Sequence, residues 1–137
     1  MSQPKKIHHI NLLVADLAEA IRRWSVLLGN CEPIFEELPT RGVTTARFDI
    51  GGTWLVLVAP TTEGEPMRIL RERGEGLFLL SLSVDDLDQA VPEGSIKGCS
   101  ALSPPRVGLA GWRVADLDDQ FAPGAVIQLT EDSGQSQ

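Results

Sequence analysis

KIHHINLLVADLAEAI, residues 6–21, is followed later in the chain by a second version of the same pattern, GLFLLSLSVDDLDQAV, residues 76–91. In each copy an apolar run is followed by an aspartate and then by a segment whose apolar residues are spaced as in a helix. The polar residues differ between the copies, because His9 corresponds to Leu79. The repeat therefore predicts a duplicated scaffold whose chemistry is not symmetric.

The first copy predicts a strand followed by a helix. Residues 7–14 are rich in Ile, Leu and Val, which is typical of a mostly buried strand. Asp16, with Glu19 three residues later, resembles a capping box at a helix start. The helix is expected to end near Gly29 and to pack one apolar stripe on a sheet, formed by Leu17, Ile21, Trp24 and Leu28.

Three short strands are predicted to complete this half, at residues 33–38, 44–50 and 53–59. Gly51 and Gly52 between the last two indicate an antiparallel hairpin. The residues that follow are rich in Pro, Gly and charge, so we expect a linker with about one helical turn around Met67 to Arg71.

The second half is predicted to begin with a strand at residues 76–84 and a short or broken helix from Asp86, because Pro92 and Gly94 do not favour its continuation. Further strands are expected weakly at residues 100–103 and then at 112–117 and 125–130, with a turn through 118–123.

The order of one strand, one helix and three strands thus occurs twice. We expect one domain over residues 1–137, made of modules at about 6–60 and 76–131, a linker at 61–75 and a disordered tail at 132–137. A single module cannot bury both faces of its sheet. The prediction is therefore an α+β fold in which two βαβββ modules pair into one curved mixed sheet with helices outside.

Composition narrows the range of functions. The chain has 137 residues, 42% of them hydrophobic, and a net charge of -7. This acidic balance disfavours nucleic acid as a partner, so we expect a small-molecule ligand or substrate. No apolar run approaches the roughly 18 to 20 residues of a membrane helix, so we expect a cytoplasmic protein without membrane contact. We also expect a homodimer.

Four stretches of the chain together resemble the vicinal oxygen chelate superfamily, which includes glyoxalase I, methylmalonyl-CoA epimerase, extradiol dioxygenases and the bleomycin-resistance proteins. The order and spacing of these stretches are most similar to the epimerase branch. The resemblance implies the same fold. The stretches are IHHINLLVADLAEAIRRWSVLLG at 7–29, ARFDIGGTWLVLVAP at 46–60, GEGLFLLSLSVDDL at 74–87 and GAVIQLTED at 124–132.

The resemblance also implies where a metal ion would bind. In metal-dependent members, the first and last strands of each module each supply one ligand, and the corresponding positions here are His9, Val56, Leu79 and Gln128. Valine and leucine offer no lone pair, and an amide is a poor substitute for a carboxylate. We therefore predict no bound metal and no other cofactor. Strand alternation predicts that His8 points away from the face of His9.

The predicted catalytic residues are His9, as base, acid or hydrogen-bond donor, with Gln128 and Asn11 steadying a substrate oxygen. Each has a structural alternative: His9 satisfied by a backbone carbonyl or by Gln128, and Gln128 holding a core water. A second group is predicted to line the substrate pocket, namely Trp54, Val56, Leu79 and Ser81.

The resulting hypothesis is a glyoxalase- or epimerase-like enzyme that transfers a proton next to a carbonyl, as an isomerase or lyase, without metal. Its substrate is small and either carries a carbonyl or is hydrophobic. Val56 and Leu79 favour an alternative, a non-enzymatic binding protein of the bleomycin-resistance type. A dimeric scaffold with a vestigial cleft is the third possibility. The Arg68, Arg71 and Arg73 cluster either contacts CoA-type phosphates or forms a solvated mixed-charge turn.

Overall fold

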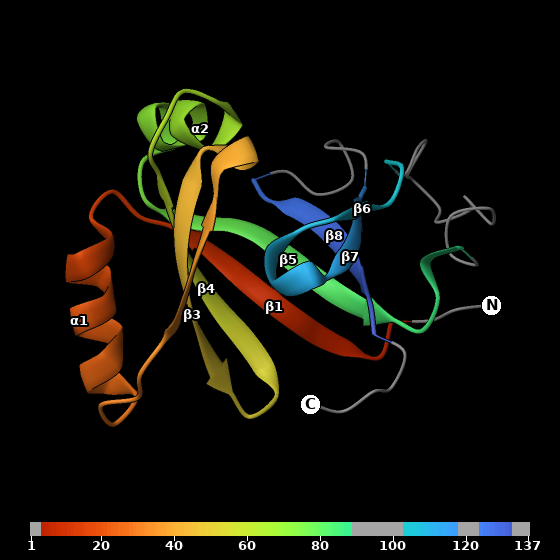
Figure 1. Cartoon of the computed structure of the whole chain (residues 1–137), viewed down its shortest axis with the longest axis horizontal. Helices are drawn as coiled ribbons and strands as arrows, with labels where there is room; N and C mark the ends of the chain where they lie inside the picture. The colour runs from red at the N-terminus through yellow and green to blue at the C-terminus, as the bar shows by residue number, and fades with distance from the viewer. Residues whose placement is uncertain (1–3, 89–102, 118–123, 133–137) are drawn as a thin grey trace. The chain divides into compact units, whose positions relative to one another are not determined.

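The computed structural model describes residues 4–88, 103–117 and 124–132. Its strands form one mixed eight-stranded sheet in the order β2-β3-β4-β1-β5-β8-β7-β6 (Figure 1). The predicted α+β class is thereby confirmed. By contacts the chain divides into two compact units, one of Met1–His9 with Leu79–Gln137 and the other of Ile10–Phe78, which we call the terminal unit and the central unit.

The observed elements follow the predicted order, apart from a short strand at Arg106–Val107 that was not predicted. In the first half they are β1 (Lys6–Leu13), α1 (Leu17–Leu27), β2 (Ile34–Leu38), β3 (Val43–Ile50), β4 (Thr53–Pro60) and α2 (Glu65–Arg73). In the second half they are β5 (Gly76–Val84), β6 (Arg106–Val107), β7 (Arg113–Asp116) and β8 (Val126–Glu131). Short 3-10 turns lie at Pro39–Arg41 and Leu109–Gly111.

Helix α1 begins and packs as its sequence predicts. The carboxylate of Asp16 accepts a hydrogen bond from the Glu19 backbone N–H at 3.1 Å, which satisfies one of the unpaired donors of the first turn. Gly29 follows the helix with a φ of 74°, a left-handed conformation that favours glycine. The apolar stripe packs against a buried cluster of the central unit, formed by Val14, Phe48, Leu55, Leu57 and Ala59.

Strands β3 and β4 form the predicted antiparallel hairpin. Gly51 and Gly52 both adopt positive φ, and Gly52 N–H donates to the Asp49 carboxylate at 2.9 Å. Alternate residues of β4 point to opposite faces. Leu55 and Leu57 belong to the cluster beneath α1, so Trp54 and Val56 lie on the other face.

The predicted linker contains more helix than expected, because α2 has nine residues rather than about one turn. Pro66 stands in its first turn, where proline is tolerated, and Ile69 is buried. Arg68 adds ion pairs along the helix to Glu65 at 2.5 Å and to Glu72 at 2.8 Å. These local pairs stabilise a helix that has little apolar periodicity.

In the terminal unit, β8 pairs with β5 in parallel and with β7 in antiparallel. One face of these strands carries a buried apolar cluster of Val84, Leu87, Ala115, Leu117 and Leu129. The alternate positions are polar and equally buried, and they include Ser81, Ser83, Gln128 and Thr130. The same strands thus separate a hydrophobic core from a buried polar face.

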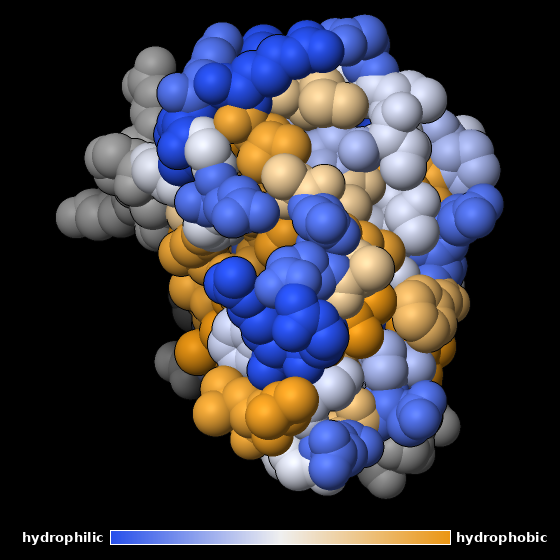
Figure 2. Space-filling model, turned by 90° about the vertical axis from the view of Figure 1, so that its left-hand side faces the viewer, coloured by the Kyte–Doolittle hydropathy of each residue, from blue (hydrophilic) through white to orange (hydrophobic). Residues whose placement is uncertain are grey.

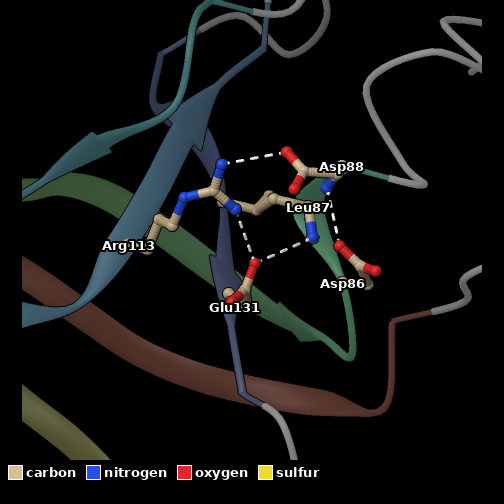
Figure 3. A network of polar contacts seen from close by, with 5 residues as sticks. All are labelled: Asp86, Leu87, Asp88, Arg113 and Glu131. Atoms are coloured by element: carbon tan, nitrogen blue, oxygen red, sulfur yellow. Dashed lines mark hydrogen bonds and ion pairs between the residues drawn. The ribbon is translucent and has the colours of Figure 1, made fainter.

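A polar network fixes the start of the second module's helix (Figure 3). Asp86 accepts from the Asp88 backbone N–H at 2.9 Å, as an N-terminal cap does. Glu131 accepts from the Leu87 N–H at 3.2 Å and pairs with Arg113 at 2.7 Å. Arg113 also pairs with Asp88 at 2.9 Å. The network therefore links β7 and β8 to the predicted helix start.

Several predictions concern residues outside the described ranges. These are the course of that helix beyond residue 88, most of the weak strand at 100–103, the turn at 118–123 and the tail at 133–137. Asp132, placed in the predicted disordered tail, is described and its N–H donates to the Val84 carbonyl at 2.7 Å. Asp132 is thus held to the end of β5 by a backbone hydrogen bond.

The outer side of α1 is mixed in character. Glu19 forms ion pairs with Arg22 and Arg23, whereas Val26 and Leu27 near the end of the helix are exposed. Figure 2 accordingly shows hydrophilic and hydrophobic residues interspersed on this face. Among the residues that the structure describes, no helix is long and apolar enough to cross a membrane.

Candidate functional site

The predicted site residues fall into two groups, one in each unit. The terminal unit contains His9, Leu79, Ser81 and Gln128, and the central unit contains Asn11, Trp54 and Val56. The four positions implied as metal ligands are divided in the same way, with Val56 alone in the central unit. Each group is described within its own unit.

His9 is 3% exposed and is surrounded by aromatic rings. Its Nδ1 lies 2.8 Å from Nδ1 of His8, and its ring stacks on Trp112 with centroids 4.6 Å apart. The His8 ring meets the same indole edge-on at 4.7 Å. The prediction that the two histidines point to opposite faces is therefore wrong. Both rings contact Trp112. The hydrogen bond between them gives each buried Nδ1 atom a partner.

Burial, and to a smaller extent the neighbouring His8, lower the pKa of His9 from 6.5 to about 3, while Gln128 opposes the shift. Burial also lowers the pKa of His8. His9 is consequently neutral at neutral pH, and its protonation costs about 5 kcal/mol more than that of an ordinary histidine. This favours hydrogen bonding by a neutral imidazole over a role as general base.

Gln128 is held by a neighbouring carboxylate. It lies directly opposite Asp116 in the β7–β8 pair, and its Nε2 donates to Asp116 Oδ1 at 3.0 Å. The other carboxylate oxygen of Asp116 pairs with Arg106 at 3.0 Å. Because Asp116 holds the amide nitrogen, the amide oxygen is directed toward His9. This oxygen forms no well-aligned hydrogen bond with any described residue. Gln128 thus presents an acceptor.

Leu79 and Ser81 lie on β5 beside Gln128. Leu79 is almost fully buried, and Ser81 is directly opposite Gln128 in the parallel β5–β8 pair. The Ser81 hydroxyl lies 2.5 Å from the hydroxyl of Thr130. Because its hydroxyl is hydrogen-bonded to Thr130, Ser81 contributes to the polar face chiefly by packing and by this bond.

In the central unit the predicted residues share one face of the strands. Leu12 packs against the cluster beneath α1, so Asn11 points to the opposite face, as do Trp54 and Val56. Val56 has no exposed surface. The side-chain oxygen of Asn11 is buried and lacks a hydrogen-bond partner within the described ranges. This face therefore combines apolar surface with an unsatisfied acceptor.

Sequence reasoning missed an arginine on this same face. Arg47 of β3 is directly opposite Val56 of β4, and paired residues of antiparallel strands project from one face. Its guanidinium pairs with Glu36 at 2.8 Å and lies 5.3 Å from the centroid of the Trp54 ring. The signal in the sequence that could have identified Arg47 is its charge within the mostly apolar stretch 46–60.

The donors present do not fit a divalent metal. Val56 and Leu79 have no lone pair, so the four implied positions retain one imidazole, His9, and one neutral amide, Gln128. Within residues 4–88, 103–117 and 124–132, no three His, Cys, Asp or Glu side chains are grouped as metal ligands.

The arginines of α2 are engaged in ion pairs. Besides the two glutamates bonded to Arg68, Arg71 pairs with Glu63 at 2.5 Å. These exposed pairs favour the solvated mixed-charge alternative over a phosphate-binding cluster.

Comparisons with known proteins agree with the fold. A profile described as "Glyoxalase/Bleomycin resistance protein/Dioxygenase superfamily" matches residues 8–115. The mitochondrial methylmalonyl-CoA epimerase of Homo sapiens is 23% identical over 129 residues, covering 92% of this chain and 73% of the relative. Among solved structures, methylmalonyl-CoA epimerase from Mycobacterium tuberculosis is 27% identical with a TM-score of 0.83, covering 93% of this chain and 88% of that one.

A variant of the Streptomyces coelicolor methylmalonyl-CoA epimerase, in complex with 2-nitronate-propionyl-CoA, has a TM-score of 0.83 at 23% identity. The match covers 96% of this chain and 99% of that chain. At this identity the similarity shows a shared fold.

Proposed function

Because the chain belongs to the glyoxalase/bleomycin resistance protein/dioxygenase superfamily, we propose that it is an isomerase-type enzyme that transfers a proton next to the carbonyl of a small acyl substrate, without a bound divalent metal. The sequence relationship to methylmalonyl-CoA epimerase supports this type of reaction. The Streptomyces enzyme is in complex with 2-nitronate-propionyl-CoA, an acyl-CoA compound, which supports an acyl thioester as substrate.

One observation carries the metal-free part of the proposal. The four positions that the resemblance assigns to metal ligands retain one imidazole and one neutral amide, because Val56 and Leu79 have no lone pair. Three or four protein ligands are typical of a catalytic metal. The residues present cannot supply that number.

In the proposed mechanism, His9 acts as a neutral hydrogen-bond donor to the carbonyl oxygen of the substrate. The lowered pKa of its imidazolium supports this role, because the ring is then neutral at neutral pH and carries one N–H. Such a donor stabilises the negative charge that develops on oxygen while solvent water accepts the α-proton and returns a proton to the same carbon. Gln128, whose amide nitrogen is held by Asp116, is proposed to accept a hydrogen bond from the substrate through its amide oxygen.

The predicted residues of the central unit are proposed to contact substrate rather than to react. Asn11 offers an unpaired acceptor oxygen for a substrate hydroxyl or N–H group. Trp54 and Val56 supply apolar surface for an acyl chain.

The test is hydrogen exchange at the α-carbon. Methylmalonyl-CoA, propionyl-CoA and acetyl-CoA are incubated with the protein in D₂O, and loss of the α-proton signal is followed by NMR before and after treatment with EDTA. We expect exchange with at least one thioester, unchanged by EDTA, and a reduction of about a hundredfold in His9→Phe. Lack of exchange with every thioester would contradict the proposal.

A second candidate function is a non-enzymatic binding protein of the bleomycin-resistance type. The buried apolar side chains at Val56 and Leu79 favour it, since both occupy positions where a metal-dependent relative needs a polar ligand. Saturable ligand-induced thermal stabilisation by aromatic drug-like compounds, without α-proton exchange, would support this candidate. Absence of both responses would leave the dimeric scaffold.

A further inference from the structure

Three adjacent strands of the terminal unit carry a chain of polar side chains that ends at Gln128. Arg106 of β6 forms an ion pair with one oxygen of the Asp116 carboxylate, on β7, at 3.0 Å. The other oxygen of Asp116 accepts a hydrogen bond from the amide nitrogen of Gln128, on β8, at 3.0 Å. Gln128 is only 4% exposed. Both oxygens of the carboxylate therefore have a partner, and the carboxylate cannot turn without breaking one of these contacts.

The chain fixes which end of the Gln128 amide faces away from Asp116. A carboxylate accepts hydrogen bonds and does not donate them, so the group that it holds must be the amide NH₂. The amide oxygen is buried and forms no well-aligned hydrogen bond within the described ranges, but Gln128 acts on His9 to raise its pKa against the effect of burial. A hydrogen-bond acceptor beside the ring has this effect, whereas a donor would lower the pKa. The amide therefore presents its oxygen to His9.

His8 and His9 can share one hydrogen atom in two ways. Their Nδ1 atoms lie 2.8 Å apart, a distance at which one nitrogen donates and the other must be bare. In the first arrangement His8 donates, and the neutral His9 ring carries its hydrogen on Nε2. In the second arrangement His9 donates from Nδ1, and its Nε2 is bare. The groups that face the two ring nitrogens decide between such tautomers.

We propose that Asp116 and Arg106 are positioning residues for His9. By holding the Gln128 amide, they direct its oxygen at the ring and so select the tautomer of His9 that is protonated at Nε2. Because Nδ1 of His9 faces His8, Nε2 is the ring nitrogen that remains to face Gln128. An amide oxygen attracts an N–H and repels a bare nitrogen, so it favours the first arrangement. The catalytic consequence rests on the proposed function, because only this tautomer offers an N–H at Nε2 to a substrate oxygen.

The direct test is the hydrogen position on each ring, read by nitrogen-15 NMR of the whole chain, without an affinity tag, at neutral pH. The chain contains only two histidines, so only their ring nitrogens need to be assigned. Protonated and bare ring nitrogens give well-separated signals. We expect His9 to be protonated at Nε2 and bare at Nδ1, and His8 to be protonated at Nδ1. A His9 ring protonated at Nδ1 in the natural chain would overturn the proposal, whatever any variant does.

Asp116→Asn keeps the size of the side chain but can present either an oxygen or an NH₂ group to Gln128. The His9 Nε2 signal should then move toward the bare range and the Nδ1 signal toward the protonated range. Arg106→Gln, which allows the carboxylate to turn, should cause a smaller shift in the same direction. Ser103→Ala is the matched control, because the Ser103 hydroxyl accepts from the Asp116 backbone N–H at 2.8 Å rather than binding its carboxylate. The natural pattern in folded Asp116→Asn, or an equal shift in Ser103→Ala, would overturn the proposal.

The result is separable from the proposed function. Exchange of the substrate α-proton is measured on the same samples and should fall as the share of His9 protonated at Nε2 falls. The predicted tautomers without exchange on any thioester would retain the positioning role and contradict the enzyme. Exchange that is unchanged when Asp116→Asn shifts the tautomer would retain the positioning role and contradict His9 as the donor to the substrate.

Discussion

Replacing His9 by asparagine should remove a large part of the acid sensitivity of this protein. The His9 pKa is about 3 in the folded chain and near 6.5 when the chain unfolds. Between those values the unfolded state binds more protons than the folded state, so stability is full above the unfolded pKa and falls as the pH decreases. From about pH 7.5 to about pH 5, the loss from His9 alone is about 2 kcal/mol.

Urea unfolding at several pH values measures this directly. The free energy of unfolding of the natural chain should fall by about 2 kcal/mol more than that of His9→Asn over this interval, because the carboxylates titrate alike in both proteins. His8 remains in the variant and serves as an internal reference for the burial of a neighbouring imidazole.

An NMR titration of the natural chain provides an independent measurement that does not depend on the variant folding. The His9 ring signals should stay in the neutral form down to the acid unfolding transition. A His9 midpoint between about pH 6 and 7, or equal pH slopes in the two proteins, would refute the stacked and buried arrangement with His8 and Trp112.

Three further predictions follow from the fold. Asp16→Ala and Asp86→Ala each remove a helix cap and should each lower the free energy of unfolding by about 1 kcal/mol, measured by urea denaturation; an effect at only one site would contradict the equivalence of the two helix starts. Phe48→Ala, which truncates a side chain with no exposed surface, should cost about 3 to 5 kcal/mol, whereas Leu27→Ala at a 72% exposed position should change stability by less than about 0.5 kcal/mol; comparable losses would contradict the core assignment. The homodimer expected from the sequence should scatter light as about twice the 14.8 kDa chain mass, and a single-chain mass across concentrations would contradict it.

The fold was accessible from the sequence because its signals are local and repeated. The apolar run before Asp16 recurs before Asp86, and both aspartates accept a backbone hydrogen bond at the start of a helix. The Gly51-Gly52 turn likewise determines its hairpin within a few residues. Helix α2 was underpredicted, because its stability comes from ion pairs such as Arg68 with Glu65 rather than from apolar periodicity.

The candidate site was less accessible because its contacts depend on side-chain direction and on strand register. Regular alternation places His8 and His9 on opposite faces, whereas Trp112 draws both rings together. Arg47 meets Glu36 from a neighbouring strand, and that partner is known only once the β2–β3 register is known. Asp116 is paired with Gln128 for the same reason.

The central claim is proton transfer by this scaffold without a divalent metal, and one measurement tests it most directly. The α-proton exchange rate of methylmalonyl-CoA is determined on the same preparation after exhaustive chelation and after addition of cobalt, with the metal content measured in parallel. We predict equal rates and a metal content far below one ion per chain. A stoichiometric ion, with exchange abolished by chelation and restored by cobalt, would contradict the account.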